Sequence, residues 1–184
     1  MGEVILITGG ARSGKSRMAE EMAMNSEGVV YVATALPIDD EMRQRIRRHR
    51  QRRPSCWTTV EKYRDLGGVI RENVGAEVIL VDCITVMITN ILMDIEIDWN
   101  DPSSSDLERA EGEVMREADG IIGAADGFTG RIILVTNEVG MSLVPEYPLG
   151  RVFRDIAGSV NQRLAEACDR VYLMVSGIPL KIKG

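Results

Sequence analysis

Near the N-terminus stands Gly9-Gly10-Ala11-Arg12-Ser13-Gly14-Lys15-Ser16, which fits the P-loop pattern G-x-x-x-x-G-K-[ST]. An apolar, β-branched run precedes it over residues 3–8, and a run rich in helix formers follows over residues 17–23. Glycines let successive backbone N–H groups point at phosphate oxygens, and the helix N-terminus adds partial positive charge. All eight residues are therefore predicted to bind nucleotide, with Lys15 at the β- and γ-phosphates and the Ser16 hydroxyl on Mg²⁺.

Apolar strands alternate with helical segments along the rest of the chain. Strands are predicted at residues 3–8, 29–34, 57–60, 77–82, 131–136 and 170–175, and helices at 17–23, 39–53, 63–73, 83–93, 106–125 and 148–168. This alternation predicts a single P-loop NTPase domain over residues 1–184, of the α/β class and RecA-like, with a mostly parallel sheet and helices on both faces. The tail at 179–183 is a candidate for a short antiparallel edge strand.

The composition is that of a globular protein, with 184 residues, 45% hydrophobic residues and a net charge of −6. An acidic chain is not built to coat nucleic acid or an anionic membrane. No stretch approaches the ~20 apolar residues of a membrane span. Cys56, Cys83 and Cys168 have neither zinc nor disulfide spacing, so a reducing, cytoplasmic location is expected.

In parallel α/β sheets, ligands bind at the carboxyl ends of the strands. The residues predicted there are the P-loop, 33–35, Asp82 and 136–138. Asp82 ends an apolar strand, as a Walker B acid does, and its carboxylate can hold Mg²⁺ directly or through water. Beside a P-loop we therefore predict that Ser16 and Asp82 hold the metal. The alternative is that Asp82 only caps the next helix.

The helix predicted at 39–53 is strongly basic, with seven arginines and no acid between Arg43 and Arg53. A positive patch on an acidic protein indicates a specific anion. Met42, Ile46, His49 and Arg53 share one helical face, and the apolar members mark that face as inward. An imidazole near phosphates can act as a general base or as a nucleophile on phosphorus. A solvated basic helix with an incidental histidine is the alternative.

A third polar segment begins with Thr136-Asn137-Glu138-Val139-Gly140 at the end of a strand. The following helix carries a polar stripe, with members Arg151, Arg154, Asp155, Gly158, Asn161 and Gln162. Such a stripe can line a substrate cleft, form a subunit interface or simply face solvent.

Together these motifs resemble the bifunctional adenosylcobinamide kinase / adenosylcobinamide-phosphate guanylyltransferase family of cobalamin biosynthesis. The resemblance covers nearly the whole chain in order. It is carried by residues 8–16, 31–35, 39–42, Arg45-Ile46, His49 to Pro54, 82–85, Thr89-Asn90, 136–140, 144–146, 153–158 and 161–163.

The resemblance implies two activities: phosphorylation of adenosylcobinamide with ATP or GTP, and transfer of GMP from GTP to that phosphate, which gives adenosylcobinamide-GDP and pyrophosphate. In the family a histidine of the arginine-rich helix carries GMP, and the matching residue here is His49. The resemblance also implies a homotrimer with active sites near subunit boundaries. Nucleotide contacts are implied at Ala33, Thr34, Ala35, Arg50, Gln51, Arg52, Arg53, Glu61 and Asp82.

Several alternatives stay open at this stage. Glu138 and Asp82 are both candidates for the base of the kinase step. The chain fits a P-loop kinase of a small molecule, in which His49 only binds phosphate. From another class, it fits a nucleic-acid-binding ATPase that uses the Arg43–Arg53 helix, although an aromatic content of 4% leaves few side chains for base stacking.

Overall fold

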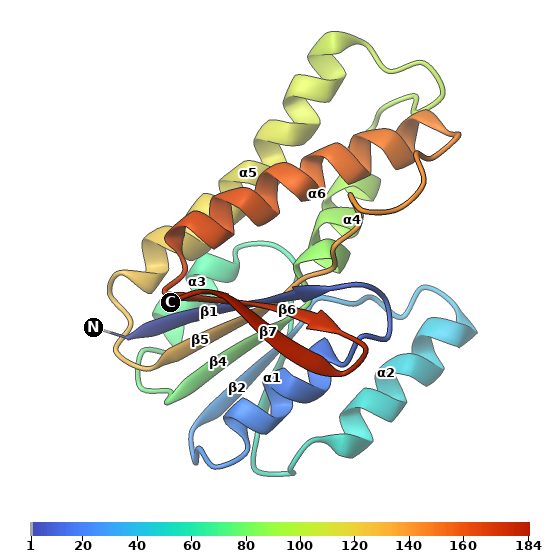
Figure 1. The fold of residues 1–184 in the computed structure, drawn as a ribbon. Coiled ribbons are helices and arrows are strands. Elements are labelled where there is room, and N and C mark those ends of the chain that lie inside the picture. Colours follow the sequence, from blue (N-terminus) through green and yellow to red (C-terminus); the bar gives the residue numbers. More distant parts are fainter. Residues whose placement is uncertain (1) are drawn as a thin grey trace.

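The structure is a computed structural model that describes residues 2–184, apart from the side chains of Glu41, Arg45 and Arg52. Within residues 2–184, seven strands form one sheet in the order β3-β2-β4-β5-β1-β6-β7 (Figure 1). The strands are β1 (Glu3–Gly9), β2 (Val29–Ala33), β3 (Thr58–Glu61), β4 (Val78–Asp82), β5 (Arg131–Val135), β6 (Arg170–Val175) and β7 (Ile178–Lys183). The first six are parallel, and β7 pairs antiparallel with β6 at the edge, as predicted.

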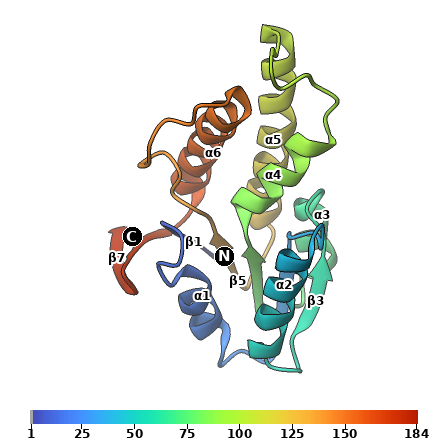
Figure 2. The ribbon, with the colours of Figure 1, turned by 90° about the vertical axis from the view of Figure 1, so that its right-hand side faces the viewer.

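Helices cover both faces of the sheet, which confirms the predicted α/β architecture. They are α1 (Lys15–Ala23), α2 (Asp40–Arg52), α3 (Leu66–Glu72), α4 (Ile84–Asp94), α5 (Ser104–Ala125) and α6 (Pro148–Ala167). One face carries α3, α4, α5 and α6, whereas α1 and α2 lie on the other side (Figure 2). Among residues 2–184, no helix is long and apolar enough to cross a membrane.

The core has two layers because the central strands are buried on both faces. Along β4, Ile79 and Val81 pack with α4, α5 and α6, while Val78 and Leu80 pack on the side of α1. A strand covered on both faces needs apolar side chains at every position, which explains the uninterrupted run at 78–81. The same burial holds the carboxyl ends of β1, β5, β4 and β2 side by side at one edge.

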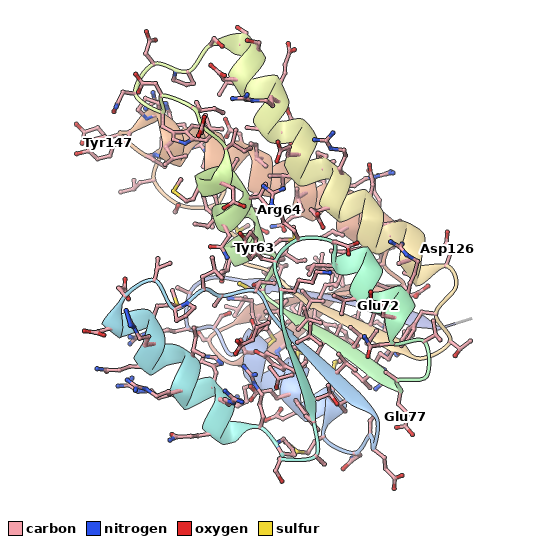
Figure 3. All side chains as sticks on the ribbon, turned by 180° about the vertical axis from the view of Figure 1, so that it is seen from behind. Tyr63, Arg64, Glu72, Glu77, Asp126 and Tyr147 are labelled. Atoms are coloured by element: carbon pink, nitrogen blue, oxygen red, sulfur yellow. The ribbon has the colours of Figure 1, made fainter. Side chains whose placement is uncertain are left out.

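The helix predicted at 63–73 is shorter in the structure and begins only at Leu66. Asp65 adopts a left-handed conformation, with φ 53°, and its carboxylate accepts a hydrogen bond from Gly68 N at 3.1 Å. Tyr63 and Arg64 instead reach toward α4, where both bind Asp94, the last residue of that helix (Figure 3). The N-cap and these tertiary contacts, rather than helix propensity, fix where the helix starts.

The helix predicted at 106–125 begins two residues earlier, at Ser104. Ser103 Oγ accepts from Asp106 N at 3.2 Å, and the Asp106 carboxylate accepts from Ser103 N at 3.2 Å. This reciprocal pair is a capping box, with aspartate in the place usually taken by glutamate or glutamine. The serines at 103–105 therefore supply the N-cap and the first residues of α5.

Candidate active site

The P-loop connects β1 to α1, as the motif requires. Gly9 has φ 147°, and a Cβ atom there would lie 2.6 Å from the carbonyl oxygen of Met174, so only glycine fits. Gly14 has φ 99° and is the N-cap of α1. Lys15 is buried, and its Nζ donates a hydrogen bond to Gly10 O at 2.6 Å. The ammonium group thus lies over the loop whose N–H groups are predicted to bind phosphates.

The register of the sheet brings the other predicted strand ends to the same edge. Val135 of β5 lies opposite both Ile7 of β1 and Asp82 of β4. Ala33 of β2 lies on the other side of Asp82. The strand that carries Asp82 is therefore separated from the P-loop strand by β5 alone.

Helix α2 places His49 over this edge. His49 is half-buried, as are Met42, Ile46 and Arg53 on the same face of α2. Arg47, on the outer face, is exposed. The predicted inward face is therefore confirmed. Asp39 is the N-cap, and its carboxylate accepts from Met42 N at 2.7 Å. The inward face closes a pocket lined by Ser16, Tyr31, Ala33, Ala35, Met42, Ile46, His49, Arg50, Arg53, Glu61, Asp82, Cys83 and Val86.

Tyr31 is a member of this pocket that the sequence did not indicate, because it reads as one more residue of an apolar strand. Its hydroxyl donates to Asp82 Oδ2 at 2.7 Å, and the Arg53 guanidinium lies 3.3 Å from the centre of its ring. Burial, together with the Asp82 carboxylate, raises the pKa of Tyr31, so the phenol stays a protonated donor. Among the described residues, Arg53 Nε has no hydrogen-bond partner. Tyr31 thus joins the predicted metal ligand to the arginine helix.

Some of the residues predicted to contact nucleotide do not line this pocket. The buried Thr34 hydroxyl donates to Cys83 O and accepts from Cys83 N, both at 2.8 Å, so it holds the β4–α4 turn. Gln51 is exposed on α2 and is not part of the pocket lining. The Arg52 side chain lies outside the described residues. Of the P-loop, Ser16 alone appears in the pocket lining described for residues 2–184.

The polar stripe of α6 does not act as one surface. Asn161 reaches the end of β5, where it accepts from Thr136 Oγ1 at 2.7 Å and donates to Asn137 O at 3.1 Å. Arg151, almost three turns earlier in α6, binds the carbonyl oxygens of Pro145 and Glu146. The stripe therefore supports the site at one end and the β5–α6 loop at the other.

The predicted magnesium ligands fit the ion by chemistry and position. Ser16 and Asp82 line one pocket and offer a hydroxyl and a carboxylate oxygen. Mg²⁺ prefers oxygen donors and is usually held by one or two protein groups plus substrate phosphates. Among residues 2–184, no three His, Cys, Asp or Glu side chains form a group that could hold a metal ion.

A larger hollow, of about 290 Å³, lies at the opposite edge of the sheet, around Glu3, Glu77 and Arg131. Its charged groups satisfy one another: Arg131 Nε lies 3.1 Å from Glu3 Oε2, and Glu77 accepts from a backbone N–H. None of the residues predicted to act on substrate lies there, so the carboxyl edge remains the candidate site.

Comparison with known proteins decides the family. The profile of the family described as cobinamide kinase / cobinamide phosphate guanyltransferase matches residues 5–182. The chain belongs to this family. It is therefore a transferase of the kind that the motifs indicated, and this assignment favours small-molecule transfer over a nucleic-acid-binding ATPase.

Curated relatives align along the whole family domain. The bifunctional adenosylcobalamin biosynthesis protein CobU of Escherichia coli strain K12 is 49% identical over 181 residues, which are 98% of this chain and 99% of the relative. The CobU protein of Salmonella typhimurium strain LT2 is 48% identical over 98% of this chain and 99% of the relative. The CobP protein of Pseudomonas aeruginosa is 44% identical over 97% of this chain and 96% of the relative.

Solved structures share the fold at low identity. An ATPase of a type III secretion system has a TM-score of 0.56 and 10% identity, covering 95% of this chain and 52% of that chain. A Pyrococcus horikoshii OT3 protein, PH0250, has a TM-score of 0.52 and 11% identity, and the match covers 100% of this chain and 87% of that chain. These likenesses support the P-loop NTPase fold alone.

Proposed function

We propose that the chain phosphorylates adenosylcobinamide with ATP or GTP, and then transfers GMP from GTP through His49 to adenosylcobinamide phosphate. The observation that carries the proposal is that His49 shares one pocket with Ser16 and Asp82. A histidine on the outer face of α2 would lie away from any phosphate held by the P-loop. The printed names of the relatives, bifunctional adenosylcobalamin biosynthesis proteins, agree with both steps.

In the guanylyl step, a ring nitrogen of His49 attacks the α-phosphorus of GTP. A P–N bond forms, the P–O bond to the β-phosphate breaks, and pyrophosphate leaves. A phosphate oxygen of adenosylcobinamide phosphate then attacks the same phosphorus and breaks the P–N bond. The products are adenosylcobinamide-GDP and free His49.

Positive groups around the pocket suit this chemistry. Arg50 and Arg53 line it beside His49, and guanidinium groups stabilise the charge that builds up on phosphate oxygens and on the leaving pyrophosphate. In this proposal Lys15, whose Nζ lies over the P-loop, binds the β- and γ-phosphates. Mg²⁺ held by Ser16 and Asp82 would neutralise further phosphate charge when bound.

Intact-protein mass spectrometry after incubation with GTP and Mg²⁺ tests the proposal. We expect an acid-labile adduct of the mass of one GMP on the wild type and none on His49→Ala. Arg47→Ala is the matched control, because Arg47 lies on the same helix but is exposed, and it should keep the adduct. No adduct on the wild type would favour a kinase in which His49 only binds phosphate. An adduct on His49→Ala would identify another nucleophile.

We also propose that the chain assembles as a homotrimer, as its resemblance to the family implies. The edge strand β7 agrees with an interface, since Ile178, Leu180 and Ile182 are more than half exposed on it. Sedimentation equilibrium of the wild type beside Leu180→Lys measures the mass. A monomeric wild type would contradict this part of the proposal.

A further inference from the structure

Two acids at the carboxyl edge were open candidates for the base of the kinase step, and the structure separates them. Asp82 lies on the α1 side, in the His49 pocket, where Oδ2 already accepts from the Tyr31 hydroxyl. Together with its predicted role toward Mg²⁺, this leaves Asp82 poorly suited to remove a proton from an acceptor. Glu138 is not part of that pocket lining.

Glu138 is fixed beside the P-loop by the sheet itself. The chain beyond β5 continues to pair with β1: Thr136 N donates to Ile7 O at 3.0 Å, and Glu138 N donates to Gly9 O at 3.1 Å. Gly9 is the first residue of the P-loop. A nucleotide bound there would therefore have its terminal phosphate near the carboxyl end of β5, because β5 lies between the P-loop strand and the Asp82 strand.

The Glu138 carboxylate faces the other side of the sheet from His49. Oε2 accepts from Thr8 Oγ1 at 3.4 Å, and Thr8 follows Leu6, which packs with α6, on the same face of β1. Among the residues that the structure describes, no donor binds Oε1. Thr8 thus makes a long contact with one oxygen of the carboxylate, and the other oxygen can accept a proton.

The surroundings of Glu138 leave room for an acceptor. Gly140, two residues further on, is exposed and has no side chain that could cover Glu138 Oε1; a Cβ atom built there would lie at an ordinary contact distance of 3.8 Å. The loop from β5 to α6, orange in Figure 1, runs on past this point and leaves Met141 and Leu143 largely exposed. A large substrate can therefore approach Glu138 from this side without displacing α2.

The backbone that carries Glu138 is also held in place. Asn161 of α6 binds both Thr136 and Asn137, and Asn137 Nδ2 donates to Thr85 Oγ1 at 2.6 Å. These contacts tie the end of β5 to α6 and to α4. A general base needs this kind of fixed geometry, because proton transfer requires a heavy-atom distance of roughly 2.6–3.2 Å.

We propose that Glu138 is the general base of the kinase step. As the acceptor hydroxyl oxygen attacks the γ-phosphorus, its O–H bond breaks and the proton passes to Glu138 Oε1. The new O–P bond forms, the bond from the γ-phosphorus to the β,γ-bridging oxygen breaks, and the nucleoside diphosphate leaves. The kinase step thus uses a base, and the guanylyl step a nucleophile, from opposite sides of the sheet. This inference rests on the kinase half of the proposed function.

Glu138→Gln tests the inference, because it keeps the shape and the hydrogen bond from Thr8 but cannot take the proton. With adenosylcobinamide and ATP, we expect kcat of phosphorylation to fall about 10²- to 10⁴-fold. The rate of GMP-adduct formation on His49 from GTP should stay within about twofold of the wild-type rate, because Glu138 takes no part in that step. Retained adduct formation also shows that the variant is folded.

Glu72→Gln is the matched control, since Glu72 is an exposed acid on α3, away from the carboxyl edge (Figure 3), and should change neither rate. A kinase rate of Glu138→Gln near wild type would overturn the inference. An equal loss of both rates would also overturn it, since it would indicate damage to the shared P-loop. If wild type phosphorylates but forms no adduct, the guanylyl half of the proposed function fails while Glu138 is still tested.

Discussion

Tyr31→Phe should weaken the site in a measurable way while leaving its shape intact. The substitution removes one hydroxyl, whose hydrogen bond to Asp82 Oδ2 is 2.7 Å long, and keeps the ring beneath Arg53. Tyr31 is only 2% exposed, so water cannot readily replace the lost donor. A hydrogen bond to a charged group is worth about 1.5–3 kcal/mol. At roughly 2–4 °C per kcal/mol for a domain of this size, the melting temperature should fall by about 3–12 °C.

Tyr63→Phe provides a control of the same chemistry in a different setting. Tyr63 OH donates to Asp94 Oδ2 at 3.1 Å, but the Asp94 carboxylate is exposed and also binds Arg64. Water can replace that hydroxyl as a donor to Asp94, so Tyr63→Phe should lower the free energy of unfolding by less than about 1 kcal/mol. Urea unfolding of both variants beside the wild type gives the free energies of unfolding.

Tyr31→Phe should also weaken the binding of Mg²⁺ at Asp82. Without the phenol, the Asp82 carboxylate has no donor from Tyr31 to hold its orientation, so Tyr31→Phe should need a higher Mg²⁺ concentration for half-maximal phosphorylation. Tyr63→Phe should not. If the two variants lost equal free energy of unfolding, burial would not strengthen the Tyr31–Asp82 hydrogen bond as argued. If Tyr31→Phe needed no more Mg²⁺ than the wild type, Tyr31 would not position Asp82.

Two further predictions concern titratable groups. Burial raises the pKa of Cys83 and raises that of Cys168 to about 12, so at neutral pH Ellman's reagent should label only Cys56 in the native chain and all three thiols after denaturation. Fast labelling of two or three native thiols would contradict this. Hydrogen bonds from the N-cap serine of α5 lower the pKa of Asp106, so its contribution to stability is full above the ordinary carboxyl pKa and is lost as the pH falls through the lowered value. The gap in urea midpoint between wild type and Asp106→Asn should therefore be present at neutral pH and shrink below about pH 4; a constant gap would contradict the linkage.

Local chemistry explains why some features were predictable from sequence. The P-loop needs glycine at Gly9 because of its φ of 147° and the nearby backbone of β6. A glycine in the motif therefore already predicts this local geometry. The inward face of α2 followed from a spacing of apolar residues that any amphipathic helix shows. His49 shares that face, and the structure places it there.

Contacts between distant segments explain what sequence reasoning missed. Tyr31 and Asp82 are 51 residues apart, and nothing in either strand signals the hydrogen bond between them. The sequence also did not indicate that the buried Thr34 hydroxyl holds the backbone of Cys83, which lies 49 residues away in the chain. The start of α3 depended on Tyr63 and Arg64 binding Asp94, a contact that helix propensity does not contain.

Local sequence was enough to predict the P-loop, the alternation of strands and helices, the basic helix with its inward histidine, and the acid at the end of β4. These features depend on neighbours within a few residues, where spacing dictates which side chains share a face. The tertiary structure alone decided the strand order, which puts β5 between the P-loop strand and the Asp82 strand. Asp82 and Glu138 follow neighbouring strands but lie on opposite faces of the sheet, where Asp82 meets Tyr31 and Glu138 meets Thr8, because long-range packing sets which face each side chain occupies.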